Sequence, residues 1–457
     1  MFSLHKAPSR VSHRRVVALA WPIVVSMLSY TAMNIVDVLL VGRLGTDALA
    51  AVGLSITLSF AVLSFGNGLL RGVKVTVAQR TGAGDDSAVE RLLWQALWLT
   101  LALGVVVSPC AFLAPAFTSR VVSEPGAAQA AGVFLAIRLA GAPLSFGMTA
   151  LSSWLQGRGD TRTPMFAVLA SHLVNIALDL VLVFGAGPVP ALGVPGAALA
   201  SVLAWLVAVS ILLPAVSGTL RRTSARPDAA LLLAVWRVGS PMGLQVVLDV
   251  ASFAVFSVLL ASVGAVQLAA HVLTIRIISV SFLPGYAIGE AGEVLVGHAV
   301  GARRFDDARS AWANSCRVAL AVMLAWGVVF VTVPDALIGV FGAEPAVAEV
   351  ARKLLFTAVA FQLFDGIQTV SFGALNGAGD TRFAMISSGL VGWFVKIPIA
   401  YVLAVYAGWG AVGAWIGLSG EIGALAAVNL WRITSGRWLA VARREPAAAL
   451  VSAHVEA

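Results

Sequence analysis

Long apolar stretches alternate along the chain with short polar ones, and this pattern predicts membrane-spanning helices. A spanning helix needs about 20 consecutive residues that are mostly apolar. The stretches here reach that length without the polar–apolar alternation that marks a barrel strand. The sequence therefore predicts an all-α polytopic membrane protein with 12 transmembrane helices, at residues 16–42, 50–79, 92–116, 130–156, 164–186, 193–217, 235–263, 268–299, 311–333, 350–376, 384–407 and 410–431.

The order of short motifs repeats in the two halves of the chain. The loop LQGRGDTR at 155–162 returns as LNGAGDTR at 375–382, and GVPGA at 193–197 returns as GAVGA at 410–414. Since each half holds six predicted helices, both halves run the same way through the bilayer. We expect two pseudo-symmetric six-helix bundles around a central cleft. Their predicted bounds are 1–217 for the amino-terminal bundle, 218–234 for a cytoplasmic linker, 235–434 for the carboxy-terminal bundle and 435–457 for a cytoplasmic tail.

Composition agrees with a membrane protein, and charge indicates its orientation. Hydrophobic residues make up 59% of the chain and charged residues 11%, against about 25% charged in an average soluble domain. The net charge of +8 could indicate a nucleic-acid partner, but most loop Lys and Arg lie on the side of the N-terminus, as in cytoplasmic loops. We therefore expect no nucleic acid, contact with membrane lipids, a multi-pass protein of the inner or plasma membrane, and both termini in the cytoplasm. The basic residues predicted at the outer ends are Arg43, Arg120, Arg138, Arg352 and Lys353.

Motifs of several other function classes are missing from the sequence. It has no phosphate-binding glycine loop and no zinc-ligand spacing, and its two cysteines lie inside apolar stretches. No nucleophile stands beside a general base. We therefore expect neither an enzyme nor an ATP-driven pump, and no cofactor or metal beyond a coupling ion, H⁺ or Na⁺.

Two acidic residues interrupt predicted spans of the amino-terminal bundle. An ionised Asp at the centre of a span costs about 2.5–3.5 kcal/mol on insertion scales, so it should face a wet cavity, a partner or a proton. Asp37 shares a helix face with Tyr30 and Asn34, and Asp179 shares one with Asn175. Both acids fall in the outer half of the bundle with no base nearby, so we expect the acids and Asn175 to bind H⁺ or Na⁺. Tyr30 and Asn34 would line a substrate cleft. The alternative is that these groups only satisfy one another between helices.

The carboxy-terminal bundle has polar faces of its own. Gln245 and Asp249 share a face of one predicted helix, and Asp365 shares a face of another with Gln362 and Gln368. The two acids are candidate ligands of the coupling cation and could equally bind a cationic substrate. The three glutamines would line the substrate cleft.

Two further charges fall inside late predicted spans, Lys396 and Glu421. Lys396 could extend its amine to the membrane surface or neutralise an acid. For Glu421 we expect a local partner.

The repeat sets opposite charges at equivalent positions of the two bundles. A shift of 219 residues takes Arg71 and Lys74 of one bundle to Glu290 and Glu293 of the other. If the two helices line the central cleft, bases and acids face one another near the cytoplasmic end. We expect an inter-lobe gate that closes the inner mouth in the outward-open state. The alternative, which the sequence supports equally well, is that water solvates each of these charges separately.

These motifs resemble the multidrug and toxic compound extrusion (MATE) family, in particular its NorM and DinF-like members. Each motif is short, but their order and matched spacing cover nearly the whole chain. The similar stretches are DVLLVGRLG at 37–45, the loops GAGD at 82–85 and GARR at 301–304, the paired GDTR loops, and FQLFDGIQ at 361–368.

The resemblance implies roles for the membrane acids. Asp37, Asn175 and Asp179 match the family's amino-lobe cation site, on which coupling to protons or sodium is thought to depend. Asp249 and Asp365 resemble acidic positions of the NorM branch. The charged residues of the predicted gate depart from the family pattern, which has small polar residues there.

Together these features predict a secondary active antiporter. It would work as a monomer and export organic cations or amphipathic drugs in exchange for H⁺ or Na⁺ by alternating access. A lipid-linked saccharide flippase of the same superfamily is one alternative, but its cavity should be cationic, whereas the cavity residues here are mainly acidic. An ion channel or membrane scaffold is another, but a channel would need a continuous polar path or a filter.

Overall fold

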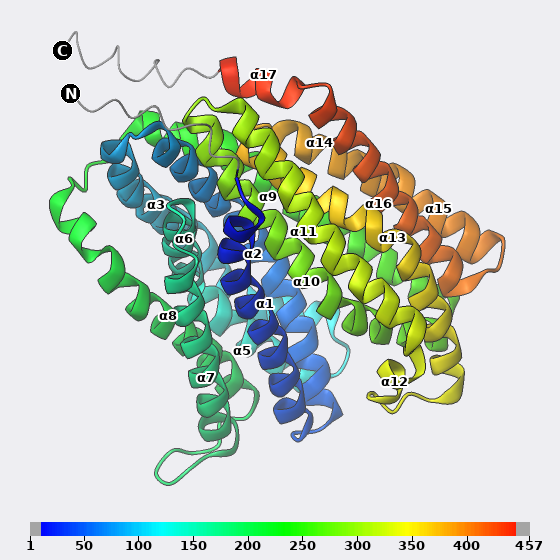
Figure 1. The fold of residues 1–457 in the computed structure, drawn as a ribbon. Helices are drawn as coiled ribbons and strands as arrows, with labels where there is room; N and C mark the ends of the chain where they lie inside the picture. The colour runs from blue at the N-terminus through cyan, green and yellow to red at the C-terminus, as the bar shows by residue number, and fades with distance from the viewer. Residues whose placement is uncertain (1–10, 445–457) are drawn as a thin grey trace, which may run out of the picture. The chain divides into compact units, whose positions relative to one another are not determined.

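A computed structural model of the chain describes residues 11–444, so positions 445–457 of the predicted tail lie outside the described residues. In the described part the regular structure is helical, apart from one isolated bridge between Ala186 and Val189 (Figure 1). The helices of the first half are α1 (His13–Gly42), α2 (Thr46–Ala83), α3 (Asp86–Val107), the 3₁₀ helix η1 (Ser108–Phe112), α4 (Ala114–Val121), α5 (Pro125–Ala140), α6 (Ala142–Gly157), α7 (Arg162–Phe184) and α8 (Val194–Arg222). Those of the second half are α9 (Ala229–Val263), α10 (Ala265–Gly301), α11 (Phe305–Thr332), α12 (Pro334–Gly339), α13 (Pro345–Gly377), α14 (Thr381–Val391), the π-helical η2 (Gly392–Lys396), α15 (Ile397–Tyr401), the π-helical η3 (Val402–Tyr406), α16 (Gly410–Thr434) and α17 (Arg437–Arg444).

Each predicted segment contains a helix, but fewer helices qualify as membrane spans. Among the described residues, ten helices are long and apolar enough to cross a membrane, or eleven if the bent pair α5 and α6 forms one span. The predicted segment 350–376 lies within α13, which is not one of these ten. The prediction of a helical multi-pass membrane protein is therefore confirmed, and the count of 12 spans stays a prediction.

Capping residues and prolines explain where several helices begin and break. Asp85 caps α3, because its carboxylate accepts a backbone N–H of the first turn at 3.1 Å. Glu124 caps α5, which begins at Pro125. The axes of α5 and α6 meet at 45° around Gly141. Since Pro143 has no N–H to continue the ladder of α5, the segment predicted as one span is two helices.

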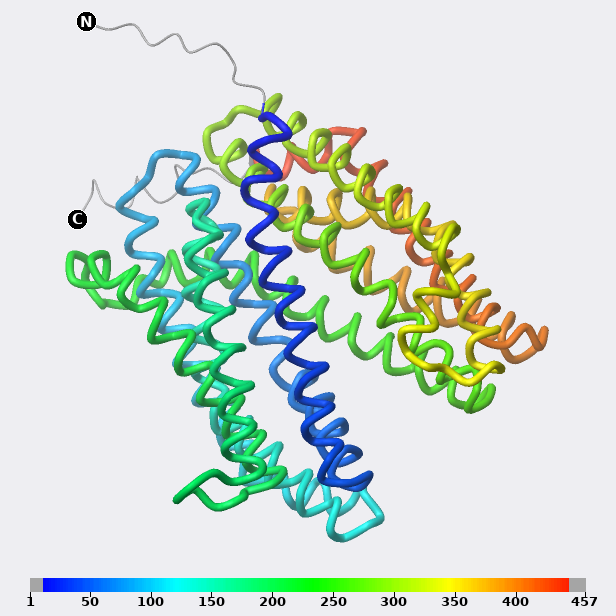
Figure 2. Tube along the Cα trace, turned by 60° about the horizontal axis from the view of Figure 1, so that its bottom comes forward, coloured from blue at the N-terminus to red at the C-terminus, as the bar shows by residue number. Residues whose placement is uncertain are grey.

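Contacts divide the chain into two compact units. Within residues 11–444, the amino-terminal unit comprises Val25–Thr81 and Asp85–Gly243, and the carboxy-terminal unit comprises 11–24, Gly82–Gly84 and the residues from Leu244 onward. Both α1 and α9 therefore contribute residues to each unit. Within the amino-terminal unit, α7 lies along α8 (Figure 2). The predicted bundle bounds, which rest on the sequence repeat, stay a prediction.

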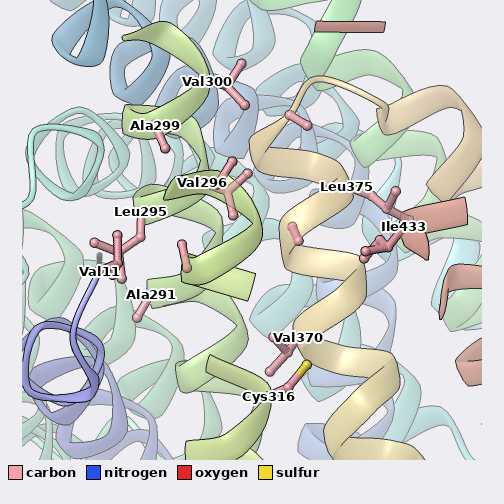
Figure 3. Close-up of a cluster of buried hydrophobic side chains, with 14 of the residues drawn as sticks. Val11, Ala291, Leu295, Val296, Ala299, Val300, Cys316, Val370, Leu375 and Ile433 are labelled. Carbon is pink, nitrogen blue, oxygen red and sulfur yellow. The ribbon is translucent and has the colours of Figure 1, made fainter. Parts of the chain in front are cut away.

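Each unit buries an apolar core and leaves other apolar side chains exposed. In the amino-terminal unit Trp154 of α6 is fully buried, and its indole N–H donates to the Val89 carbonyl of α3 at 2.8 Å. In the carboxy-terminal unit the core joins α10, α11, α13 and α16, with Val370 beside Cys316 (Figure 3). Phe112, by contrast, is 87% exposed. Exposed apolar side chains are expected where lipid surrounds the helices.

Glycines let α10 and α13 approach closely. A Cβ atom on Gly373 would lie 2.3 Å from the Gly289 carbonyl oxygen, and one on Gly377 would lie 2.3 Å from the Glu293 carbonyl oxygen. Small residues allow such backbone contact between membrane helices, where close packing drives association. The crossing fixes α13, which carries Asp365, against α10.

The two copies of the GDTR loop have the same backbone. The N–H of Asp160 and that of Asp380 each donate to the carbonyl five residues earlier, at 3.0 Å and 2.9 Å. The preceding glycines have φ angles of 92° at Gly159 and 87° at Gly379. A left-handed backbone costs other residues about 1–2 kcal/mol, so both loops favour glycine there. Local structure therefore repeats at this loop, as its sequence does.

Candidate cation and substrate site

A small cavity in the amino-terminal unit collects polar residues predicted from the sequence. Tyr30, Asn34 and Asp37 line it from α1, and His172 and Asn175 line it from α7. The two polar helix faces therefore meet. The cavity volume is about 90 Å³, well below the roughly 300–1,000 Å³ of drug-sized pockets. Tyr30 and Asn34, predicted for a substrate cleft, thus share an ion-sized cavity with the predicted cation ligands.

Several polar atoms at this cavity have open hydrogen-bonding capacity. Asp179 is 2% exposed and close enough to Asp37 for their charges to interact. Both carboxylate oxygens of Asp179, one of Asp37 and both amide atoms of Asn175 have no hydrogen-bond partner within residues 11–444. His172 differs, because its Nδ1 lies 2.9 Å from the Ser29 hydroxyl. Buried polar groups are normally satisfied, so the open atoms are suited to hold a proton, an ion or water.

An arginine lies in the same cavity. Arg138 of α5 lines it within electrostatic reach of Asp37. Its Nε donates to the Ser59 hydroxyl at 3.0 Å, and its Nη1 donates to the Ser201 hydroxyl at 3.3 Å. The guanidinium also lies over the Trp205 ring, 4.8 Å from the centroid. Neutral groups therefore hold this cation in place beside the acids.

The position of Arg138 corrects two expectations. The sequence predicts this residue at an outer helix end and predicts an acid pocket with no base nearby. Because α5 runs from Pro125 to Ala140, Arg138 lies ~3.6 turns from the first residue, in the last turn before the bend to α6. The available signal was the stretch FLAIRLA at 134–140, where an arginine sits among apolar residues. A charge in such a place faces a partner or a wet cavity.

A second charged cluster lies in the carboxy-terminal unit. The Lys396 Nζ lies 3.1 Å and 3.0 Å from the two carboxylate oxygens of Glu421, and both residues are buried. Asp249 is within electrostatic reach of Lys396. Its oxygens accept from the Ser388 hydroxyl at 2.7 Å and from the Gln245 amide at 3.1 Å. Lys396 thus neutralises an acid and does not extend to a surface, and Asp249 has a donor on each oxygen.

A π-helical turn positions Lys396 toward its partner. The turn η2 ends at Lys396, and such wider turns often occur at functional positions within helices. At Gly392 a Cβ atom would lie 3.0 Å from a Glu421 oxygen and 3.3 Å from the Ser252 hydroxyl. The absence of a side chain at Gly392 therefore gives Glu421 the space to reach the amine.

The remaining predicted residues of this unit lie along α13. Asp365 is 4% exposed and interacts with Thr369. The Gln362 amide donates to the Ser281 hydroxyl of α10 at 2.9 Å, and the Gln368 carbonyl accepts from the Thr369 hydroxyl at 3.1 Å. The two predicted acid ligands of this unit therefore have different partners, and their roles stay predictions.

The predicted gate residues lie on α2 and α10. Arg71 and Lys74 belong to the amino-terminal unit, and Glu290 and Glu293 belong to the carboxy-terminal unit. Within each helix the spacing of three residues places the two side chains on one face. Pairing between the units stays a prediction.

A protein-family model accounts for most of the chain. The MatE model matches it twice, at residues 22–181 and 241–402. The chain belongs to the MatE family. The two matches begin 219 residues apart, at the shift that relates the sequence landmarks of the two halves. The resemblance to the multidrug and toxic compound extrusion family is thereby confirmed.

Relatives of this MatE-family chain match it over nearly its full length. The probable multidrug resistance protein NorM of Burkholderia pseudomallei (strain K96243) is 33% identical over 428 residues, which are 91% of each chain. The multidrug resistance protein NorM of Burkholderia vietnamiensis is 31% identical over 439 residues, 93% of this chain and 95% of its own. A solved structure described as an outward-facing conformation of a multidrug resistance MATE family transporter of the MOP superfamily covers 95% of this chain and 98% of its own. Its TM-score of 0.85 at 23% identity shows a shared fold.

Proposed function

We propose that this chain is a secondary active transporter that exports organic cations or amphipathic drugs and takes up H⁺ or Na⁺ in exchange. The supporting observation is that Asp37 and Asp179 interact beside a helix-lined cavity and keep carboxylate oxygens open to a cation. The names of the relatives, multidrug resistance proteins, support drugs as cargo. The buried acids of both units favour a cationic cargo over the pyrophosphate of a lipid-linked saccharide.

In the proposed cycle, binding of a cation to the two acids changes the conformation of the transporter. While both acids are ionised, Asp37 and Asp179 repel each other, and one bound cation removes that repulsion. Cation binding therefore changes the relative stability of two arrangements of the helices that carry the acids, and cargo needs only to favour the other arrangement. Cation and drug can then exchange without sharing a site. A cavity of about 90 Å³, too small for a drug, supports such a division.

The remaining predicted residues take the cargo and gating roles in this proposal. The protein would work as a monomer in the inner or plasma membrane, with both termini in the cytoplasm. Asp249 and Asp365 would attract the cationic cargo or a second coupling ion. Cargo contacts are assigned to Tyr30, Asn34, Gln245, Gln362 and Gln368, and the inner gate to Arg71, Lys74, Glu290 and Glu293.

Everted membrane vesicles that contain the chain test the proposal. We expect ethidium to accumulate inside under at least one of two gradients, an acidic lumen or a sodium-rich lumen, and we expect no accumulation after an ionophore collapses that gradient. Vesicles with the Asp37→Asn, Asp179→Asn double variant are the matched control and should behave as empty ones. Ethidium movement that ignores both gradients would contradict antiport. Movement of a lipid-linked saccharide without any dye export would favour the flippase.

A further inference from the structure

We infer that Arg138 is a specificity-determining residue that makes the amino-terminal cavity take a proton in preference to Na⁺; the inference rests on the antiport proposed above. Two carboxylates, of Asp37 and Asp179, and one guanidinium share the cavity region. When all three are ionised their net charge is −1. One further positive charge therefore neutralises the site, and Arg138 influences which cation supplies it.

Arg138 engages neutral oxygens that a sodium ion would need. A metal ion that enters a protein site exchanges its hydration shell for several oxygen ligands. The hydroxyl oxygens of Ser59 and Ser201 already accept hydrogen bonds from the guanidinium, at 3.0 Å and 3.3 Å. Among the fully buried side-chain atoms of residues 11–444 at this site, the oxygens that remain open belong to the two acids and Asn175. Sodium would thus compete with Arg138 for the two hydroxyl oxygens and would meet the repelling charge of the guanidinium.

A proton does not meet the same obstacle. It forms one covalent O–H bond with a single carboxylate oxygen and needs no shell of ligands. The protonated acid can then donate to the other carboxylate, because the side chains of Asp37 and Asp179 lie within hydrogen-bond reach of each other. The net charge falls to zero in either case, but only the proton leaves the contacts of Arg138 intact.

The surroundings of Arg138 keep it in the cavity. Its guanidinium lies 4.8 Å from the Trp205 ring centroid and 5.8 Å from that of Phe134. Rings on two helices, α8 and α5, therefore hold the cation in place, and Ser59 and Ser201 fix its orientation. Tyr30 and Asp37 of α1 lie within electrostatic reach of Arg138, and His172 of α7 lines the same cavity. Asp179 of α7 interacts with Asp37.

Sodium binding to the purified protein tests the inference without any transport. Arg138→Met removes the charge and frees both hydroxyl oxygens at similar side-chain length, whereas Arg138→Lys keeps the charge and is the matched control. We measure equilibrium binding of radioactive Na⁺ in detergent, with K⁺ as competitor. We expect the Met variant to bind Na⁺ at least about 10-fold more tightly than wild type, and the Lys variant to stay near wild type. Equal Na⁺ affinity in wild type and the Met variant would overturn the inference.

A second substitution tests whether the Na⁺ that the Met variant binds lies in this cavity. Adding Asp37→Asn to the Met variant should abolish the gained Na⁺ binding, and its persistence would also overturn the inference. If the Met variant elutes as an aggregate, Arg138→Gln replaces it.

In vesicles, a pH gradient should drive wild-type export, and a sodium gradient should drive export only in the Met variant. If neither gradient drives wild type while the Met variant gains Na⁺ binding, the proposed function fails and the selectivity role of Arg138 stands.

Discussion

The amino-terminal cavity and the charged cluster of the carboxy-terminal unit each combine two acids with one base, yet they arrange them differently. In the cavity, hydroxyl groups and an indole ring hold Arg138, and Asp37 and Asp179 keep open oxygens. In the carboxy-terminal cluster, Glu421 contacts Lys396 directly at 3.0 Å.

Hydrogen bonding explains what the difference means for binding. Asp249, the other acid of the carboxy-terminal cluster, accepts from Ser388 and Gln245. A cation that binds there must replace existing donors, whereas one that binds at Asp37 uses oxygen that is already open. Among these two sites, the amino-terminal cavity is therefore better suited to exchange an ion, and the carboxy-terminal cluster is better suited to hold helices together.

The acids of the amino-terminal cavity and of the carboxy-terminal cluster are not related to each other by the sequence repeat. Adding the shift of 219 residues to Asp37 leads to Phe256, which is fully buried. Subtracting it from Asp249 leads to Tyr30, which lines the amino-terminal cavity. The two halves thus share backbone features, such as the paired loops, while the acids Asp37 and Asp249 have no acidic counterpart in the other half.

Neutralising the acids is the strongest test of this contrast. We expect Asp37→Asn and Asp179→Asn each to reduce gradient-driven ethidium accumulation to the level of empty vesicles, because the open carboxylates carry the coupling charge. Asp249→Asn should reduce it by less than either of these variants, since Ser388 and Gln245 already engage the Asp249 oxygens and Asp249 attracts cargo without being part of the Asp37 and Asp179 pair. Initial rates are measured at matched protein content, with Asp47→Asn, an exposed acid at the start of α2, as control. A loss at Asp249 as large as that at Asp37 would contradict the division of roles.

Breaking the buried ion pair tests the structural role of the carboxy-terminal cluster. Glu421→Leu leaves the Lys396 charge without its carboxylate, and removal of one partner of a buried pair costs about 3–5 kcal/mol of unfolding free energy. Replacing both residues, as Lys396→Met with Glu421→Leu, should recover most of that loss. Titration with SDS in mixed micelles, followed by circular dichroism, gives the free energies. A double variant as unstable as the single one would show that the pair does not act as a unit.

Helix positions could be read from the sequence because the signal is local and strong. Apolar stretches of spanning length mark the helices, and an acid within such a stretch marks a polar face, as at Asp37 and Asp179. The meeting of these two faces in one cavity also followed from helical periodicity. These features depend on a few neighbouring residues along the chain.

Other features depend on contacts between distant segments and were missed or left open. The place of Arg138 follows from the early start of α5 and from hydroxyl groups on α2 and α8. The π-helical turn before Lys396 accompanies its contact with Glu421, 25 residues later. A count of basic residues by loop places Arg138 at an outer helix end, because such a count depends on sequence position alone. The partners of Arg138 on other helices, Ser59 and Ser201, do not enter it.

The two GDTR loops provide the smallest test, because their aspartates share a backbone but not their partners. One carboxylate oxygen of Asp160 accepts the N–H groups of Arg162 and Thr163 at 3.1 Å and 3.0 Å, as a helix cap does, and the other accepts the Thr163 hydroxyl at 2.6 Å. Asp380 binds Arg432 through both carboxylate oxygens, at 2.8 Å and 3.2 Å, and is 5% exposed. The carboxylate of Asp160 therefore accepts hydrogen bonds from neutral groups of the next helical turn, whereas the carboxylate of Asp380 binds a charged partner.

Substitution by asparagine separates these two uses. In Asp160→Asn the amide oxygen still accepts the two N–H groups, but the amide nitrogen cannot accept the Thr163 hydroxyl, so we expect a cost of about 0.5–1.5 kcal/mol of unfolding free energy. Asp380→Asn removes the charge that Arg432 binds and should cost about 1.5–3 kcal/mol. The same SDS titration compares both variants with wild type. If both variants lost the same unfolding free energy, the bidentate pair of Asp380 and Arg432 would contribute no more than the cap at Asp160. The two halves would then be alike at this loop in stability as well as in backbone.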